Sequence, residues 1–377
     1  MKRSPAVHWV ITLTGGASLA MALSLAGTAV VPAAELGQGP ANTLFTLSNA
    51  ASGNAVLAVT ERHGGGSAVV AFSTGGKGTG VGLGSQGAIT LAEGGSRLIA
   101  VNAGSNTVSA FEVSESGRLE LIGSAPSGGL DPISVTARGR FVYVLNAGNN
   151  TVSGLRLGED GLAPIAGSNA ALSAGAVAPV QVSFTPNGED LVVAEKGSNT
   201  IDVLAVDQDG RLGSPRATIS TGATPFGFDF DSAGHLVISD AVGGAPGKSA
   251  LTSYRVRESG ALSPISFVPD LQTAACWVVI DRRGHAFTTN TGSGSVSSYG
   301  IASNGSLTLH ASVAASTGGH PLDEALSSGG NELFVLDGAG RILSTAVLAS
   351  GDLGPVKVVA TGLPAGVTGL AATLDRE

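Results

Sequence analysis

Residues Val142–Leu155 read VYVLNAGNNTVSGL, and variants of this pattern return along the whole chain. An apolar run closes on Asn146, a turn of Gly148, Asn149 and Asn150 follows, and an alternating run begins at Thr151. β-branched residues bounded by Gly and Asn predict two short strands joined by a tight turn. This stretch therefore predicts the middle hairpin of a β-sheet unit.

The apolar run is one of seven that recur about 50 residues apart, which is the spacing of β-propeller blades. All seven end in Asn, Asp or Glu. The segments are Leu44–Asn49, Leu98–Asn102, Val142–Asn146, Leu191–Glu195, Leu236–Asp240, Ala286–Asn290 and Leu333–Asp337. Two more short strands accompany each hairpin, so every repeat predicts four strands.

The repeats predict an all-β, seven-bladed β-propeller of four-stranded antiparallel blades, formed by residues 43–377 as one domain. The first repeat has no clear innermost strand, while an additional strand, Gly366–Ala372, follows the last repeat. We therefore expect the C-terminal strand to complete the first blade and close the ring. A pair of β-sandwiches is the competing architecture, but it would not produce seven equal units.

The N-terminus has the pattern of an export signal. Lys2 and Arg3 precede an apolar stretch over about 7–31, and Ala33 offers a small residue for cleavage. We expect a signal peptide over 1–33, a linker over 34–42, and a secreted, periplasmic or cell-envelope protein. An uncleaved membrane anchor is the alternative. After signal removal we expect a monomer without a membrane partner.

The composition and charge of the chain exclude several classes of partner and site. A formal net charge of −8 argues against a nucleic-acid partner, because phosphate binding needs a basic surface. Cys276 is the only cysteine, so an internal disulfide is impossible, and its apolar surroundings predict a buried small side chain. The His residues show no metal-ligand spacing, so we expect no metal and no cofactor. Residues Gly82–Gly87 match a dinucleotide fingerprint by letters only, and we expect a loop there.

The repeat resembles the lactonase family of seven-bladed propellers, which includes 6-phosphogluconolactonase-like proteins and a carboxymuconate-lactonising enzyme. The matching stretches are Tyr143–Val152 and Phe184–Gly188. The resemblance implies a catalytic Glu at Glu195, and it places Gln181 where the family has His and Val180 where it has Arg. Loss of that Arg removes a phosphate-binding group. The chain therefore looks similar to an exported branch of this family.

Candidate site residues follow from propeller geometry, because second strands end, and innermost strands begin, at the same mouth of the channel. Asn146, Asn290 and Glu195 end second strands, although Asn at such ends also serves ordinary turns. Lys196 follows Glu195, either as a solvated pair or as an acid–base pair at the mouth. Alignment of the innermost strands on Gly188, Gly234, Gly284 and Gly330 puts Gln181, Trp277 and Asp323 in register, with side chains expected toward the channel.

Trp277 is either a core residue or a stacking platform for a ligand. His320, in the loop before Asp323, is the nearest candidate for proton transfer at the mouth, although a loop His is also commonly just exposed.

Two functions follow as expectations. The first is a hydrolase or isomerase that acts on a small lactone or cyclic acid in the central channel, with Glu195 as general base and Lys196 or Gln181 steadying negative charge. In this case Trp277, Asp323, His320, Asn146 and Asn290 contact the substrate. The second is a non-catalytic exported propeller that binds a ligand or a partner.

Overall fold

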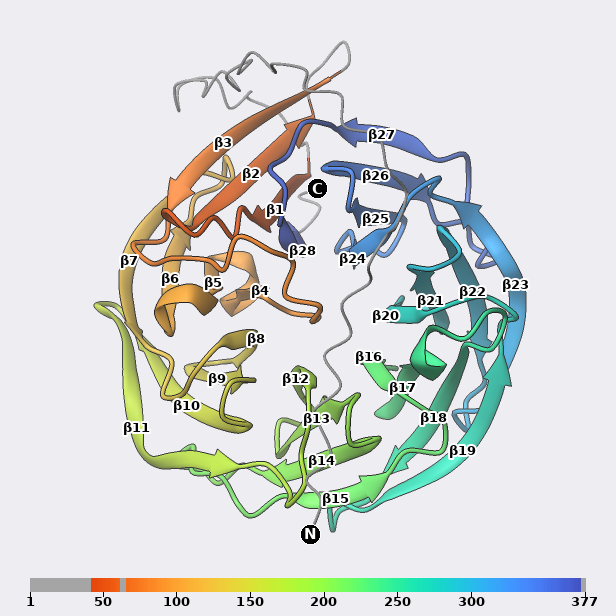
Figure 1. Cartoon of the computed structure of the whole chain (residues 1–377), viewed down its shortest axis with the longest axis horizontal. Helices are drawn as coiled ribbons and strands as arrows, with labels where there is room; N and C mark the ends of the chain where they lie inside the picture. Colours follow the sequence, from red (N-terminus) through yellow and green to blue (C-terminus); the bar gives the residue numbers. More distant parts are fainter. Residues whose placement is uncertain (1–41, 62–65, 374–377) are drawn as a thin grey trace, which may run out of the picture.

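A computed structural model describes residues 42–61 and 66–373, which form seven four-stranded sheets in a closed ring. Figure 1 shows the sheets arranged as blades around a central axis, numbered here 1 to 7 in chain order. All strand pairs within the blades are antiparallel. The predicted seven-bladed β-propeller is confirmed. The expected signal peptide, and the linker except its last residue, lie outside the described residues.

The strands, from the innermost to the outermost of each blade, have the following bounds. Blade 1 has β28 (Thr368–Ala372), β1 (Thr43–Leu47), β2 (Ala55–Glu61) and β3 (Ser67–Ser73); blade 2 has β4 (Ile89–Ala92), β5 (Arg97–Asn102), β6 (Thr107–Val113) and β7 (Leu119–Pro126); blade 3 has β8 (Pro132–Arg138), β9 (Phe141–Asn146), β10 (Thr151–Gly158) and β11 (Gly161–Ala171). Blade 4 has β12 (Pro179–Phe184), β13 (Asp190–Glu195), β14 (Thr200–Ala205) and β15 (Arg216–Ile219); blade 5 has β16 (Pro225–Phe230), β17 (His235–Asp240), β18 (Ala250–Val256) and β19 (Leu262–Pro269). Blade 6 has β20 (Ala275–Ile280), β21 (His285–Asn290), β22 (Ser295–Ile301) and β23 (Leu307–Ser316); blade 7 has β24 (Pro321–Leu326), β25 (Glu332–Asp337), β26 (Arg341–Ala346) and β27 (Lys357–Ala360).

Helix is confined, in the described ranges, to three single 3₁₀ turns: η2 (Glu93–Gly95), η3 (Ala103–Ser105) and η4 (Val242–Gly244). This agrees with the absence of helical periodicity in the repeats. Within the same ranges no helix combines the length and the apolar character needed to cross a membrane.

The ring closes through its C-terminal strand, as predicted. β28 pairs antiparallel with β1, with Phe45 opposite Ala371, so residues from the two ends of the domain share blade 1. On its other side, β28 contacts blade 7, because the backbone N–H of Leu370 donates a hydrogen bond to the Asp323 carboxylate at 3.1 Å. Closure therefore leaves no innermost strand unpaired.

The hydrophobic core lies between blades rather than within them. In β13, Leu191 and Val193 pack toward blade 3, while Val192 and Ala194 pack toward blade 5. This alternation follows from the two-residue period of a strand, because both faces of each blade are covered by neighbours. Small aliphatic side chains suit the narrow spaces near the axis, where neighbouring blades converge.

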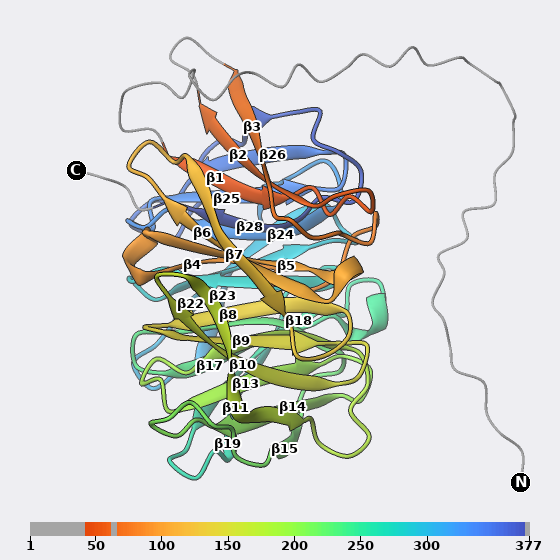
Figure 2. The same ribbon diagram turned by 90° about the vertical axis from the view of Figure 1, so that its left-hand side faces the viewer.

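The two faces of the disc are built differently. In each blade the second strand ends, and the innermost strand begins, on the face turned toward the viewer in Figure 1. The same face carries the crossovers, the segments that lead from the outermost strand of one blade to the innermost strand of the next. We call it the crossover face; it lies on the right in Figure 2. The opposite face carries the hairpin turns that join first to second and third to fourth strands, and we call it the turn face.

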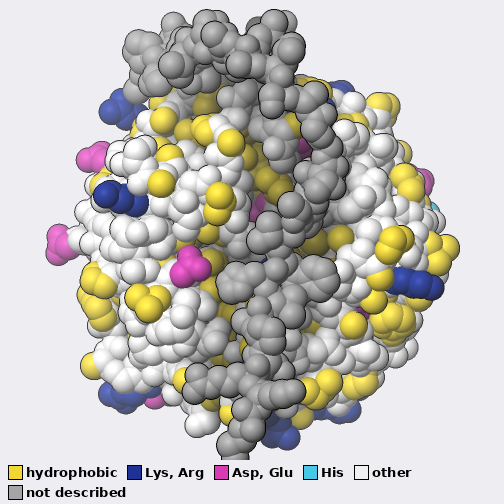
Figure 3. All heavy atoms as spheres, in the orientation of Figure 1, with side chains coloured by type: hydrophobic (Ala, Val, Ile, Leu, Met, Phe, Trp, Pro, Cys, Tyr) yellow, Lys and Arg dark blue, Asp and Glu magenta, His cyan; other side chains and the backbone are white. Residues whose placement is uncertain are grey.

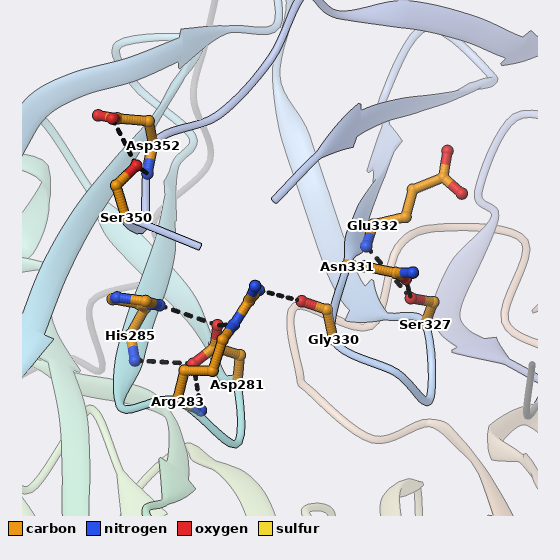
Figure 4. A network of polar contacts seen from close by, with 9 residues as sticks. All are labelled: Asp281, Arg283, His285, Ser327, Gly330, Asn331, Glu332, Ser350 and Asp352. Carbon is orange, nitrogen blue, oxygen red and sulfur yellow. Dashed lines mark hydrogen bonds and ion pairs between the residues drawn. The ribbon is translucent and has the colours of Figure 1, made fainter. Parts of the chain in front are cut away.

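Polar side chains tie adjacent blades together on the turn face. Asp281 holds its own hairpin through the ring Nδ1 of His285 at 2.9 Å and Nε of Arg283 at 2.9 Å. The guanidinium of Arg283 continues to the carbonyl of Gly330 in blade 7 at 2.7 Å, as Figure 4 shows. Burial raises the pKa of Asp281, but hydrogen bonds from the His285 backbone and ring and from Arg283 outweigh it, so the pKa is lowered overall. The network is structural, since each carboxylate oxygen is already bonded.

Candidate active site at the channel mouth

The central channel is filled at the crossover face by residues Leu83–Gly87 of the β3–β4 connection, which runs inward in Figure 1. We call this segment the plug. The Ser85 hydroxyl donates to the carbonyl of Ile133 in blade 3, and the Gln86 backbone N–H donates to the carbonyl of Val180 in blade 4. The Gln86 amide reaches Val278 in blade 6. The expected loop at Gly82–Gly87 therefore spans the channel.

Polar residues at the ends of the second strands serve mainly their own hairpins. The Asn146 amide donates to the hydroxyls of Ser153 at 3.0 Å and Thr151 at 3.4 Å. Asn290 donates to Ser295 and Ser297, five and seven residues further along the chain. Both side chains are fully buried. Their geometry supports the turn-forming interpretation of Asn146 and Asn290, and leaves their side chains out of contact with solvent at the mouth.

Blade 4 departs from this pattern because two carboxyl groups replace an amide and a hydroxyl. Glu195 stands at the Asn position, and Asp202 stands seven residues later, where blades 2, 3 and 6 have Ser. Both residues are fully buried, and each has one carboxyl oxygen without a hydrogen-bond partner. The other Glu195 oxygen, Oε2, accepts from the Ser198 hydroxyl at 2.6 Å.

Burial is the main reason that the pKa of Glu195 rises to about 7, and Asp202 raises it further. The Ser198 hydroxyl acts in the opposite direction, because it donates to the ionised form. A carboxyl group that titrates near neutral pH is suited to general acid–base catalysis. Among the residues predicted from the sequence, Glu195 therefore has the electrostatics that this chemistry requires.

A crossover covers Glu195. The segment Leu172–Ala178 leads from blade 3 to blade 4, and its Ser173 N–H donates to Oδ2 of Asp202 at 2.7 Å. The carbonyls of Ala178 and Val177 accept from the backbone N–H groups of Lys196 and Gly197, residues that directly follow Glu195. A ligand can reach the carboxyl only where this crossover gives way.

Lys196 projects away from Glu195, toward blade 5. Its ammonium lies 4.6 Å from the ring centroid of Phe226 and donates to the plug carbonyl of Gly84 at 3.3 Å. Burial lowers the pKa of Lys196, while the neighbouring Cys276 thiol raises it slightly. No ion pair joins Lys196 to Glu195 among the described residues. The structure thus does not bring these two side chains together as an acid–base pair.

Gln181 and Trp277 are buried and already bonded. The Gln181 amide faces blade 5, where it donates to the carbonyl of Phe228 at 2.9 Å and accepts from its N–H at 2.7 Å. Trp277 donates its indole N–H to the carbonyl of Ser85 at 3.2 Å and packs edge-on against Phe226. These contacts support the core interpretation of Trp277. Cys276 is buried, as predicted, and burial raises the pKa of its thiol to about 11.

Asp323 is buried between blades 7 and 1 rather than exposed at the channel mouth. Its two oxygens accept backbone N–H groups of Glu324 and Leu370, and it is almost completely buried. Asp323 and Asp229 are both close enough to Glu324 to interact with it electrostatically, and the pKa values of all three are raised, in each case mainly by burial. Neither Glu324 oxygen makes a hydrogen bond. In the part of the chain that the structure describes, no group of three or more His, Cys, Asp and Glu side chains could hold a metal ion.

His320 is exposed on the crossover face, and its Nδ1 lies 3.1 Å from the carbonyl of Thr291. It contacts neither Asp323 nor Glu195 in any described interaction. The expected convergence of Glu195, Lys196, Gln181, Trp277, Asp323 and His320 is therefore only partial. Lys196 and Trp277 meet at the plug, whereas Glu195 lies on the opposite side of the blade 4 sheet, beside Asp202.

Comparison with known proteins gives the family of this seven-bladed propeller. Residues 43–162 and 162–242 match the family described as lactonase, seven-bladed β-propeller. The chain belongs to this family. A search of curated proteins found no match.

Solved structures support the same fold at low sequence identity. A candidate 6-phosphogluconolactonase from Bacteroides fragilis has a TM-score of 0.69 and 18% identity, over 89% of this chain and 99% of that one. A protein from Lactobacillus plantarum has a TM-score of 0.70 and 17% identity, over 88% and 99%. The periplasmic gluconolactonase of Pseudomonas aeruginosa has a TM-score of 0.67 and 17% identity, over 89% and 99%. At these identities the likeness shows the fold alone.

Proposed function

We propose that the protein is an exported lactonase-type hydrolase that opens a small lactone at the channel mouth, with Glu195 as general base. One observation carries the proposal: blade 4 alone places a buried glutamate at the hairpin-amide position with a second buried carboxyl, Asp202, beside it, and burial raises the pKa of this glutamate to about 7. Family membership supports the reaction class, and the periplasmic Pseudomonas aeruginosa relative supports an exported location.

In the proposed reaction, ionised Glu195 takes a proton from water, and the water oxygen bonds to the lactone carbonyl carbon. The tetrahedral intermediate collapses with cleavage of the ring C–O bond. The proton passes to the ring oxygen, which gives a hydroxy acid. Substrate entry requires displacement of the Leu172–Ala178 crossover that covers the carboxyl. Lys196 contributes positive charge near the mouth, whereas Gln181 has both amide atoms engaged and takes no part.

The substrate class follows from the innermost strand of blade 4. Val180, in the position where the family resemblance implies Arg, is fully buried in the core between blades 4 and 5. No guanidinium stands there to bind a phosphate. We therefore propose that lactones without a phosphate group are preferred over their 6-phosphorylated counterparts.

Titration of released acid at constant pH, with aldonolactones and their 6-phosphates as substrates, tests the proposal on three proteins. Glu195→Gln should lower kcat at least 100-fold, because the amide cannot accept the proton. Asp240→Asn is the matched control: it makes the same acid-to-amide change at the equivalent position of blade 5, where burial also raises the carboxyl pKa to about 7. It should keep kcat within about three-fold, since the assigned base is untouched.

Equal losses in both variants would mean that buried carboxyls at these positions act structurally. If the parent protein opens none of the lactones, the non-catalytic alternative, a ligand- or partner-binding propeller, replaces the enzyme proposal.

A further inference from the structure

The crossover face carries few charged side chains that reach solvent, and most of them are cationic. Among the described residues on this face, the acids Glu195, Asp240, Asp270 and Asp337 are buried and Asp131 is half-buried, whereas Lys77 and Lys248 are exposed. The remaining acids that reach solvent lie around the turn face and the outer strands. Figure 3 views the crossover face, where the described surface is mainly white and yellow with few charged side chains. A chain with a net charge of −8 thus presents one face on which, among the described residues, the half-buried Asp131 is the single acid that reaches solvent, beside the exposed Lys77 and Lys248.

The same face carries exposed aliphatic side chains. Val81, Leu130, Val177 and Leu271 lie on four different crossovers and are 65%, 53%, 52% and 67% exposed. They come from separate parts of the ring, and three of them, Val81, Leu130 and Val177, lie on loops rich in Gly, Ser and Ala. Because they come from separate blades, they form a ring of projecting apolar residues rather than one groove.

Leu271 is held in an unfavourable backbone conformation. Its φ is +64°, in the left-handed region that favours Gly or Asn, and most of its side chain is exposed to solvent. A branched apolar residue gains no packing there to offset the strain. Backbone strain that no packing contact offsets indicates that the Leu271 side chain serves a function.

We propose that the crossover face docks on an anionic lipid bilayer, with the four aliphatic residues inserted among the headgroups and Lys77 and Lys248 against the lipid phosphates. Projecting apolar residues together with lysines, on a face where Asp131 is the single described acid that reaches solvent, suit this surface. Strands of about six residues, at about 3.3 Å each, place the turn-face acids roughly 20 Å away. That distance exceeds two Debye lengths at physiological salt, so their repulsion is screened.

The docking residues and the proposed lactone site share the crossover face, since Val177 belongs to the crossover that covers Glu195. Vesicle binding is measured without lactone turnover, so the two proposals can fail separately. Docking revises the expectation that the mature protein has no membrane partner. Sequence reasoning considered only a spanning segment. The docking residues come from different repeats, and their common face becomes visible only in the assembled ring.

Co-sedimentation with vesicles of phosphatidylglycerol and phosphatidylcholine tests the proposal on the full chain. Leu130→Ser combined with Leu271→Asn should reduce the bound fraction at least five-fold. Leu121→Ser combined with Val358→Ser, two exposed aliphatic residues near the turn-face ends of outer strands, is the matched control and should bind like the parent. Every variant keeps the N-terminal apolar segment, so its contribution is the same in all of them.

Two further variants test the contribution of the lysines and of the strained Leu271 separately. Lys77→Glu with Lys248→Glu should weaken binding to phosphatidylglycerol vesicles at low salt. Leu271→Asn alone should raise the melting temperature while it lowers binding, because Asn relieves the backbone strain. Equal binding of the parent and the Leu130/Leu271 variant would overturn the proposal, as would loss of binding in the outer-strand control. Self-association through this face, detected by light scattering without vesicles and abolished by the Leu130/Leu271 variant, would also overturn it in favour of a second copy.

Discussion

The side-chain amide of Gln86 spans the channel and pairs with the backbone of Val278, donating from Nε2 to the carbonyl at 2.9 Å and accepting the N–H at Oε1 over 3.2 Å. Gln181 makes the same pair of bonds to Phe228, which is the equivalent residue of blade 5. Blade 5 has Gly227 where blade 4 has Gln181, and a Cβ at Gly227 would lie 2.3 Å from Oε1 of Gln86. The plug thus supplies from across the channel the amide that blade 5 lacks.

Gln86→Ala should lower the free energy of unfolding by about 2–4 kcal/mol, because it leaves a buried N–H and a buried carbonyl without partners. Urea unfolding measures the change. Gln208→Ala, at an exposed turn residue, is the control and should change stability by less than about 0.5 kcal/mol. A similar stability for both variants would show that the plug is not structural.

Deletion of residues 364–377 should destabilise the ring by several kcal/mol, since it removes β28, its pairing with β1 and the buried side chain of Leu370. Deletion of 374–377 alone is the control and should melt like the full chain. If the longer truncation also melts like the full chain, closure through β28 contributes nothing to stability.

Asp240→Asn should flatten the pH dependence of stability. Burial raises the pKa of Asp240 to about 7, against the weaker effect of the Thr252 hydroxyl bonded to it, so between about pH 4 and 7 the folded state holds a proton that the unfolded state releases. The stabilising contribution is complete below about pH 4 and is lost as the pH rises through 7, by at most about 1.4 kcal/mol per pH unit.

Urea unfolding from pH 4 to 8 measures this slope, which should be less negative in Asp240→Asn than in the parent. Asp209→Asn, at an exposed carboxylate on the turn face, should leave the slope unchanged. A steeper fall of stability with pH in Asp240→Asn would contradict the assignment.

The seven-bladed ring could be predicted from the sequence because the same strand and turn pattern occurs in every blade. Seven apolar runs with the same turn chemistry specify seven blades, and the leftover strand Gly366–Ala372 specifies the closure. Asp202 was also within reach, since it occupies the position seven residues after Glu195 where Asn102, Asn146 and Asn290 have Ser. Comparison of the repeats position by position would have singled out this pair of acids.

The contacts of the plug could not be predicted in this way. Gln86 and Val278 are 192 residues apart, and the bond exists because one crossover bends into the channel instead of passing over its neighbour. The orientation of side chains on the innermost strands could not be predicted either. Bulges at the start of these strands, as between Pro179 and Gln181, change which side chains face the axis. Gln181, Trp277 and Asp323 therefore share a register but contact a neighbouring blade or the plug.

The pKa of Glu195 should move in opposite directions when two residues that lie beside its carboxyl group in blade 4, Asp202 and Ser198, are changed separately. Asp202→Asn removes the nearby acid and should lower the pKa below 7, while Ser198→Ala removes the hydroxyl that donates to Oε2 and should raise it. If ionised Glu195 is the base, the rate of lactone opening rises with pH through this pKa. The midpoint of the pH–rate profile should then shift to lower pH in Asp202→Asn and to higher pH in Ser198→Ala. Titration of the glutamate carboxyl by ¹³C NMR gives the same pKa without turnover, and shifts of one sign in both variants would contradict the coupling.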